Sequence, residues 1–122
     1  MLKSYRELQV WQRSIQLATA VYRLAACFPR DEVYGLSSQM KRAAVSVASN
    51  IAEGYGRLST GEYRQFLAIA RGSALELQTQ FEIAHRLEIG DGKLLDEAEG
   101  LSEEVSKMLY AMIDKLKTTK TN

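Results

Sequence analysis

The spacing Glu82-x-x-His85 is the pattern in this sequence that matches a metal-ligand arrangement. In a four-helix bundle, two such pairs and two further glutamates hold a di-iron centre. His85 is the only histidine of the 122 residues, so the second pair is missing. On a helical wheel, Glu82 and His85 also lie opposite the apolar face of their segment, which predicts that they point away from the bundle interior. We therefore expect a solvated surface pair here and no metal site.

Other residues with chemical potential lack the partners that their chemistry requires. Gly54-Tyr55-Gly56 resembles the start of a dinucleotide-binding loop, but a predicted helix precedes it and the third glycine is missing. Gly54 is better explained as the residue that follows a helix. Cys27 is the only cysteine, which excludes an internal disulfide, and nothing places His85 beside it as a base. With no nucleophile–base pair and no acid–base pair, we expect no catalytic residue, no cofactor and no enzymatic activity.

A polar strip on the second predicted helix has two open interpretations. It comprises Ser38, Arg42, Ser46, Ser49, Asn50 and Glu53. Glu76 or Arg71, on the next helix along the chain, is the candidate partner of Arg42, Asn50 and Glu53. The strip is either the solvent face of its helix or a hydrogen-bonded network buried between helices. Buried polar groups cost free energy unless they are paired, so a network would fix the helix register more than it would add stability.

Basic residues form the second candidate site. Arg57, Arg64 and Arg71 are spaced by seven, which places Arg64 and Arg71 on one stripe of a helix, and Lys41 lies nearby in the sequence. The net charge of the whole chain is only +1, whereas nucleic-acid-binding domains usually carry a larger basic excess. Residues 1–71 hold ten basic and five acidic residues, giving +5, and residues 72–122 hold six and ten, giving −4. A ring of identical subunits would repeat these arginines around its axis.

These residues must be positioned by helices, because apolar residues recur at helical and never at alternating spacing. Pro29 ends the first helix, and Ser59 with Glu62 forms a capping box at the start of the third. Three short connections between four helices favour an all-α, up-down-up-down antiparallel four-helix bundle. We expect one domain over residues 1–122, with helices at about residues 5–27, 31–53, 60–89 and 92–117.

Some predicted helices carry more apolar residues than one core can bury. The main stripe of the first helix is predicted to be Leu8, Trp11, Ile15, Ala18, Val21, Tyr22, Ala25 and Phe28, broadened by Val10, Leu17 and Leu24. Second stripes follow on the second helix (Val45, Ala48, Ala52) and on the third (Ile69, Ile83, Leu87). A lone bundle would expose these second stripes, and association into a homo-oligomer would cover them.

Composition limits the class of protein further. The chain is 46% hydrophobic and 25% charged, which is too apolar for a disordered segment. No apolar run approaches the ~20 residues of a membrane span, and the start of the chain has no secretory core. We expect a cytoplasmic protein that does not contact membranes.

Six short motifs within about residues 5–90 are specific in combination. They are Val10-Trp11-Gln12, Phe28-Pro29, Tyr34-Gly35-Leu36, Gln39-Met40-Lys41-Arg42-Ala43-Ala44-x-Ser46, Asn50-Ile51-Ala52-Glu53-Gly54 and Gly72-Ser73-Ala74-x-Glu76. Through these motifs the sequence resembles the four-helix-bundle proteins encoded in intervening sequences of bacterial 23S rRNA genes, and also the accessory variability proteins of diversity-generating retroelements.

This resemblance implies a bundle that assembles into a ring-like homo-oligomer, with a pentamer as the expected ring. It implies a family without a known enzymatic activity, whose retroelement members look like basic partners of nucleic acid and a reverse transcriptase. The near-neutral charge of this chain departs from that branch. Two functions are therefore carried forward: a scaffold that binds RNA or a nucleic-acid–protein complex, and a protein-interaction scaffold that binds no nucleic acid.

Overall fold

The computed structural model describes residues 4–32 and 34–120, with side chains up to Lys117. Within this part of the chain, four long helices follow one another, and short 3-10 helices precede the first two. The α-helices are α1 (Gln9–Ala25), α2 (Leu36–Tyr55), α3 (Thr60–Leu87) and α4 (Gly92–Lys120). The 3-10 helices are η1 (Tyr5–Glu7) and η2 (Arg30–Glu32).

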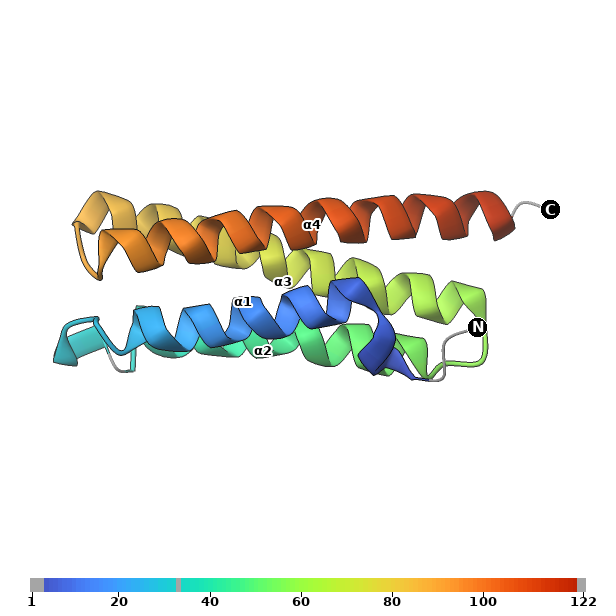
Figure 1. Ribbon diagram of the computed structural model, residues 1–122, viewed down its shortest axis with the longest axis horizontal. Helices are drawn as coiled ribbons and strands as arrows, with labels where there is room; N and C mark the ends of the chain where they lie inside the picture. The colour runs from blue at the N-terminus through green and yellow to red at the C-terminus, as the bar shows by residue number, and fades with distance from the viewer. Residues whose placement is uncertain (1–3, 33, 121–122) are drawn as a thin grey trace.

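The helices run antiparallel in two layers, with α1 and α2 in one layer and α3 and α4 in the other (Figure 1). Contacts join α1 to α2, α2 to α3, α3 to α4 and α4 to α1, whereas the two diagonal pairs of described helices do not touch. The α2–α3 turn and both chain ends lie at one end of the bundle, and the α1–α2 and α3–α4 connections lie at the other (Figure 1). The predicted all-α class is confirmed.

The core is a seam of residues that recur every three or four positions along each helix, as in coiled-coil-like bundle packing. The fully buried large side chains are Phe81, Leu17, Leu24, Met40, Ile51, Leu67, Leu77, Leu109, Val10, Val21, Val47 and Val105. Alanines fill the remaining positions where helices approach closely, as at Ala44, Ala70 and Ala98.

The stripe predicted to be the main apolar face of α1 is confirmed only in part, since Val21 and Ala25 of that stripe are buried. Leu17 and Leu24 are completely buried, whereas Ile15 is 39% and Tyr22 is 49% exposed. The sequence does not reveal the buried side of α1 clearly, because Ser14 interrupts its apolar pattern. Ser14 is fully buried and donates its hydroxyl hydrogen bond to the carbonyl of Trp11 at 2.6 Å, which satisfies the polar group within the helix.

The start of α2 differs from the prediction of about residue 31. Residues Arg30–Glu32 form η2, and α2 begins at Leu36. Glu32 supplies the cap, since its Oε1 accepts from the Leu36 backbone N–H at 3.0 Å. A carboxylate at this end also complements the helix dipole.

The predicted end of α2 is also wrong. Gly54 does not follow the helix but lies buried inside it, and α2 continues to Tyr55. A Cβ at Gly54 would lie 2.7 Å from the Cβ of Phe66 on α3. The glycine is therefore required by the close approach of two helices.

The two remaining connections agree better with the sequence. Ser59 caps α3 by accepting from the Glu62 backbone N–H at 3.1 Å, as predicted. Helix α3 ends at Leu87, two residues before the predicted end, because Glu88 adopts a left-handed conformation with φ 54°. Gly90, with φ 85°, then packs against Phe28 and turns the chain into α4, which Asp91 caps.

Helix α4 continues to Lys120, three residues beyond the predicted end. Residues 121–122 lie outside the described part of the chain. None of the described helices combines the length and the apolar character that crossing a lipid bilayer requires.

Candidate functional site

A polar cluster crosses the contact between α2 and α3. The hydroxyl oxygens of Ser46 on α2 and Ser73 on α3 lie 2.9 Å apart. The Asn50 amide donates to the Ser46 carbonyl at 2.8 Å and to the Ser46 hydroxyl at 3.0 Å. The Ser46–Ser73 contact therefore links the two helices, Asn50 supports it from α2, and together they fix the register of α2 against α3.

Beside this cluster lies a half-open cavity of about 210 Å³. Its lining residues are Gln39, Arg42, Ala43, Ser46, Ser73 and Glu76. Arg42 and Glu76 both line the cavity, but the structure gives no ion pair between them. Arg42 instead contacts the Ser38 hydroxyl at 3.4 Å, and Glu76 accepts from the Gln80 amide at 3.4 Å. The cavity thus offers donors and acceptors, and its serines have no imidazole or carboxylate bonded to them as a base.

The predicted network of Arg42, Asn50, Glu53 and Glu76 is assembled only in part. Arg42 and Glu76 line the cavity, and Asn50 joins the cluster through Ser46. Glu53 is not in contact with them, because its carboxylate pairs with Arg57 at 3.2 Å. Sequence reasoning placed Ser46 on the polar strip but missed Ser73, although its small hydroxyl on an otherwise apolar flank was a usable signal.

The structure divides the predicted basic residues among three surroundings. Arg64 donates from Nε to the carbonyl of Ile113 at 3.1 Å, and the Arg71 guanidinium lies 5.3 Å from the ring centre of Tyr110, so both face α4. The Arg71 Nε is buried and has no hydrogen-bond partner.

Arg57 and Lys41 point elsewhere. The Arg57 guanidinium lies 4.6 Å from the ring centre of Phe66, close to the α2–α3 turn. Lys41 lies against α1, with Nζ 5.2 Å from the ring centre of Tyr22. Lys41 faces α1 from α2, whereas Arg64 and Arg71 face α4 from α3, and α2 does not contact α4 among the described residues. Lys41 therefore does not share a surface with these two arginines.

An aromatic pair marks the α2–α3 turn. The rings of Tyr55 and Tyr63 meet edge to face with centres 6.0 Å apart. Burial raises the pKa of the Tyr63 phenol above its ordinary value of 10.0, and the neighbouring Tyr55 raises it further. The folded chain therefore holds this proton more tightly than the unfolded chain does.

Alkaline pH should therefore weaken the fold through Tyr63. The stabilisation is fully present below the pKa of the unfolded phenol and is lost as pH rises through the higher pKa of the folded one. We expect the Tyr63→Phe variant to lose less stability between neutral and strongly alkaline pH than the parent, measured by urea midpoints. Tyr34→Phe, at a site that is 96% exposed, is the matched control and should follow the parent. Identical alkaline losses in all three proteins would contradict this assignment.

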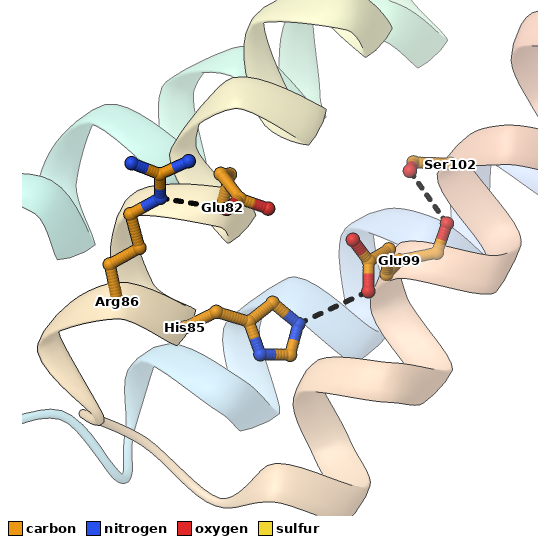
Figure 2. A network of polar contacts seen from close by, with 5 residues as sticks. All are labelled: Glu82, His85, Arg86, Glu99 and Ser102. Carbon is orange, nitrogen blue, oxygen red and sulfur yellow. Dashed lines mark hydrogen bonds and ion pairs between the residues drawn. The ribbon is translucent and has the colours of Figure 1, made fainter.

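The Glu82-x-x-His85 pattern does not form a unit. The Glu82 carboxylate binds Arg86 at 2.9 Å, whereas His85 turns toward α4 and its Nε2 lies 3.2 Å from Glu99 (Figure 2). Cys27 is exposed, and its thiol donates to the Arg23 carbonyl at 3.6 Å. The imidazole and the thiol therefore have separate partners.

Comparison with known proteins identifies the same bundle elsewhere. The family described as 23S rRNA-intervening sequence protein matches residues 6–111. A crystal structure of a protein of unknown function from the S23 ribosomal protein family, from Bacteroides thetaiotaomicron, superimposes with a TM-score of 0.79. The two chains are 24% identical, and the match covers 85% of this chain and 97% of the other, which shows a shared fold. No curated protein matches the sequence.

Proposed function

Because this chain belongs to the family of 23S rRNA-intervening sequence proteins and leaves two separate apolar surfaces exposed, we propose that it works as a non-enzymatic, ring-like homo-oligomer that binds RNA. The two apolar surfaces carry the proposal. Monomeric proteins rarely expose large contiguous apolar patches, and larger patches mark interaction sites.

The first apolar surface is a groove of about 280 Å³ between α1 and α2. Its lining residues are Tyr5, Trp11, Ile15, Ala18, Val45, Ala48, Ser49 and Ala52. Val45 stands 44% exposed at the middle of the groove, next to the small Ala48. A groove floored by alanines and rimmed by larger side chains can accept the ridge of another helix.

The second apolar surface is the outer side of α3. Ile69, Leu75, Ile83 and Leu87 are between 40% and 57% exposed there. The outer side of α3 in one copy can pack into the groove between α1 and α2 of the next copy. Because the two surfaces differ, this is a head-to-tail contact. Such contacts close into a ring when the rotation allows it. The ring of this proposal has five subunits, as the sequence resemblance implies.

RNA binding rests on the basic residues at the end of the bundle where the α2–α3 turn meets the end of α4 (Figure 1). Arg57 and Arg64 lie there, and Arg71 lies about two turns further along α3, also against α4. Lys115 and Lys117 follow near the end of α4. A ring repeats this set once per subunit around the axis. Backbone phosphates of a single RNA could then contact several subunits, which would compensate for the net charge of only +1 per chain.

A protein-binding scaffold is the second candidate, and one observation favours it. The guanidinium groups of Arg64 and Arg71 already contact α4, so they are less free to bind phosphates than exposed arginines are. A protein-interaction ring would use the same apolar surfaces for assembly and would retain no nucleic acid.

The deciding experiment is light scattering on size-fractionated protein at ~50 mM and ~200 mM salt, with absorbance recorded at 260 and 280 nm. We expect an oligomer that carries RNA at the lower salt concentration and releases it at the higher one. The Val45→Arg variant should yield a monomer, because it places a charge in the apolar groove. Gln9→Arg, at an exposed position of α1 that lines neither apolar surface, should assemble normally. A monomeric parent protein would contradict the ring.

The RNA contact is tested by Arg64→Gln combined with Arg71→Gln, using anisotropy of a labelled mixed-sequence single-stranded RNA. Glutamine keeps a polar donor beside α4 while removing the charge. We expect binding to weaken by about tenfold or more and the salt dependence to become less steep. Arg23→Gln with Arg30→Gln removes the same charge at the opposite end of the bundle and should leave binding unchanged. Equal binding by the parent and both double variants would favour the protein scaffold.

A further inference from the structure

The α3–α4 hairpin brings three metal-ligating side chains together that the sequence does not present as a motif. Donor atoms of His85 on α3 and of Asp96 and Glu99 on α4 all lie within 4.8 Å of one another. We propose that this hairpin binds one divalent transition-metal ion of the zinc class, with the His85 imidazole and the two carboxylates as its protein ligands. This site is independent of RNA binding and of assembly.

The donor set has the composition of a zinc site. Zinc accepts imidazole nitrogen and carboxylate oxygen at ~2.0–2.2 Å in a tetrahedral arrangement, which places neighbouring ligand atoms roughly 3.4 Å apart. The His85 Nε2 and the Glu99 Oε1 are already 3.2 Å apart, so two of the three ligands have this separation. Asp96 is exposed and completes the set by a side-chain rotation. The imidazole distinguishes the site from a purely acidic cluster, because nitrogen favours zinc over magnesium or calcium.

The backbone holds the ligands in place from two rigid elements. Asp96 and Glu99 are three residues apart on α4, so both face the same side of that helix. His85 lies in the last turn of α3, and the left-handed Glu88 and the packed Gly90 fix the turn that follows. An ion bound here would join the end of α3 to the beginning of α4.

Charge balance at the hairpin also favours a cation. Asp96 and Glu99 place two carboxylates close together, and neither pairs with a lysine or arginine among the described side chains. Arg86 is the cation next to His85 in sequence, but its guanidinium binds Glu82 and lies away from Glu99 (Figure 2). Because Glu82 already pairs with Arg86, the carboxylates that remain available to His85 are those of α4. A divalent ion would neutralise both carboxylates at once.

The test is isothermal titration of ZnCl2 into the full chain after chelator treatment and removal of any histidine tag. We expect one ion per chain, with affinity lowered about tenfold or more by Asp96→Asn and by His85→Gln. Glu97→Gln removes the same charge from an adjacent exposed residue that is not in the ligand set, and it should bind as the parent does. Cys27→Ser should also bind normally, which separates this site from the exposed thiol.

A spectroscopic readout distinguishes imidazole ligation from diffuse attraction of cations. His85 is the only histidine of the chain, so its ring C–H resonances are assigned without further variants. Zinc should shift them, and excess MgCl2 should neither shift them nor displace zinc. The proposal is overturned if the parent binds no zinc, if Glu97→Gln weakens binding as much as Asp96→Asn, if Cys27→Ser abolishes binding, or if the His85 resonances stay fixed.

Discussion

Replacing Phe81 with alanine should lower the free energy of unfolding by about 3–5 kcal/mol, the largest effect expected from a single truncation in this bundle. Phe81 is the largest of the fully buried side chains, and the small Ala84 is its fully buried neighbour one turn along α3. The truncation removes the whole ring from an interior that has few atoms able to move into the space. Denaturant unfolding followed by circular dichroism, at one protein concentration, measures the loss.

Leu58→Ala is the control for Phe81→Ala, because it truncates a fully exposed apolar side chain just before α3 that belongs to neither apolar surface. Its cost should stay near about 0.5 kcal/mol or below, as for most surface substitutions. A Phe81→Ala cost similar to that of Leu58→Ala would mean that the α3 face assigned to the core does not face the other helices.

The second large effect concerns Gly54, where a single methyl group should destabilise the bundle by about 1–3 kcal/mol. The added Cβ of Gly54→Ala would lie 2.7 Å from the Phe66 Cβ and 3.2 Å from the Tyr63 Cδ1. Neither neighbour is the end of a flexible side chain, so α2 and α3 must move apart. This displacement would also strain the hydrogen bond between Ser46 and Ser73, which joins the same two helices about two turns away.

Glycines at open positions of two other helices provide the matched controls for Gly54→Ala. Gly72 on α3 and Gly100 on α4 have no atom near the position that a Cβ would occupy. Alanine at either position should stabilise the protein by about 0.5–1 kcal/mol, because alanine favours helix more than glycine does. The same substitution should therefore have opposite signs at buried and open glycines, and a gain in stability for Gly54→Ala would contradict the close approach of α2 and α3.

The four helices were predictable from the sequence because most of their boundaries depend on local chemistry. Pro29, the Ser59–Glu62 cap and the periodic apolar residues act over a few positions, and the four helices follow from them. The beginning of α2 was missed because its cap, the Glu32 side chain, lies four residues before Leu36 and comes from a separate 3-10 turn. Such a cap depends on the folded loop, which residue spacing alone does not reveal.

Which side of each helix faces the core was harder to predict than where the helices lie in the sequence. Helix α1 has two apolar faces, and its sequence does not say which one meets the other three helices. The serine in the buried seam, Ser14, satisfies its own hydroxyl and so resembles a surface residue in the sequence. The role of Gly54 was predicted wrongly for a related reason. A glycine near a helix end looks like the residue that ends the helix unless the opposing helix is known.

The candidate sites depend on contacts between helices, which explains why sequence patterns found only parts of them. Ser73 becomes a partner of Ser46 only when α2 and α3 pack in this register. His85 finds Glu99 across the hairpin, and not Glu82 on its own helix. Lys41 and Arg71 looked like one group in the sequence but contact α1 and α4 respectively.

The cyclic order of helix contacts has a consequence for how fast the chain folds. Three of the four helix pairings join neighbours along the chain, and α1 with α4 is the pairing that closes the bundle. Folding rates rise as the mean sequence separation of native contacts falls, because little loop-closure entropy is lost before contacts form. Since most of its native contacts join neighbouring helices, this topology belongs with the microsecond-to-millisecond folders. Rapid collapse shortens the time for which the apolar surfaces of unassembled chains are exposed to aggregation.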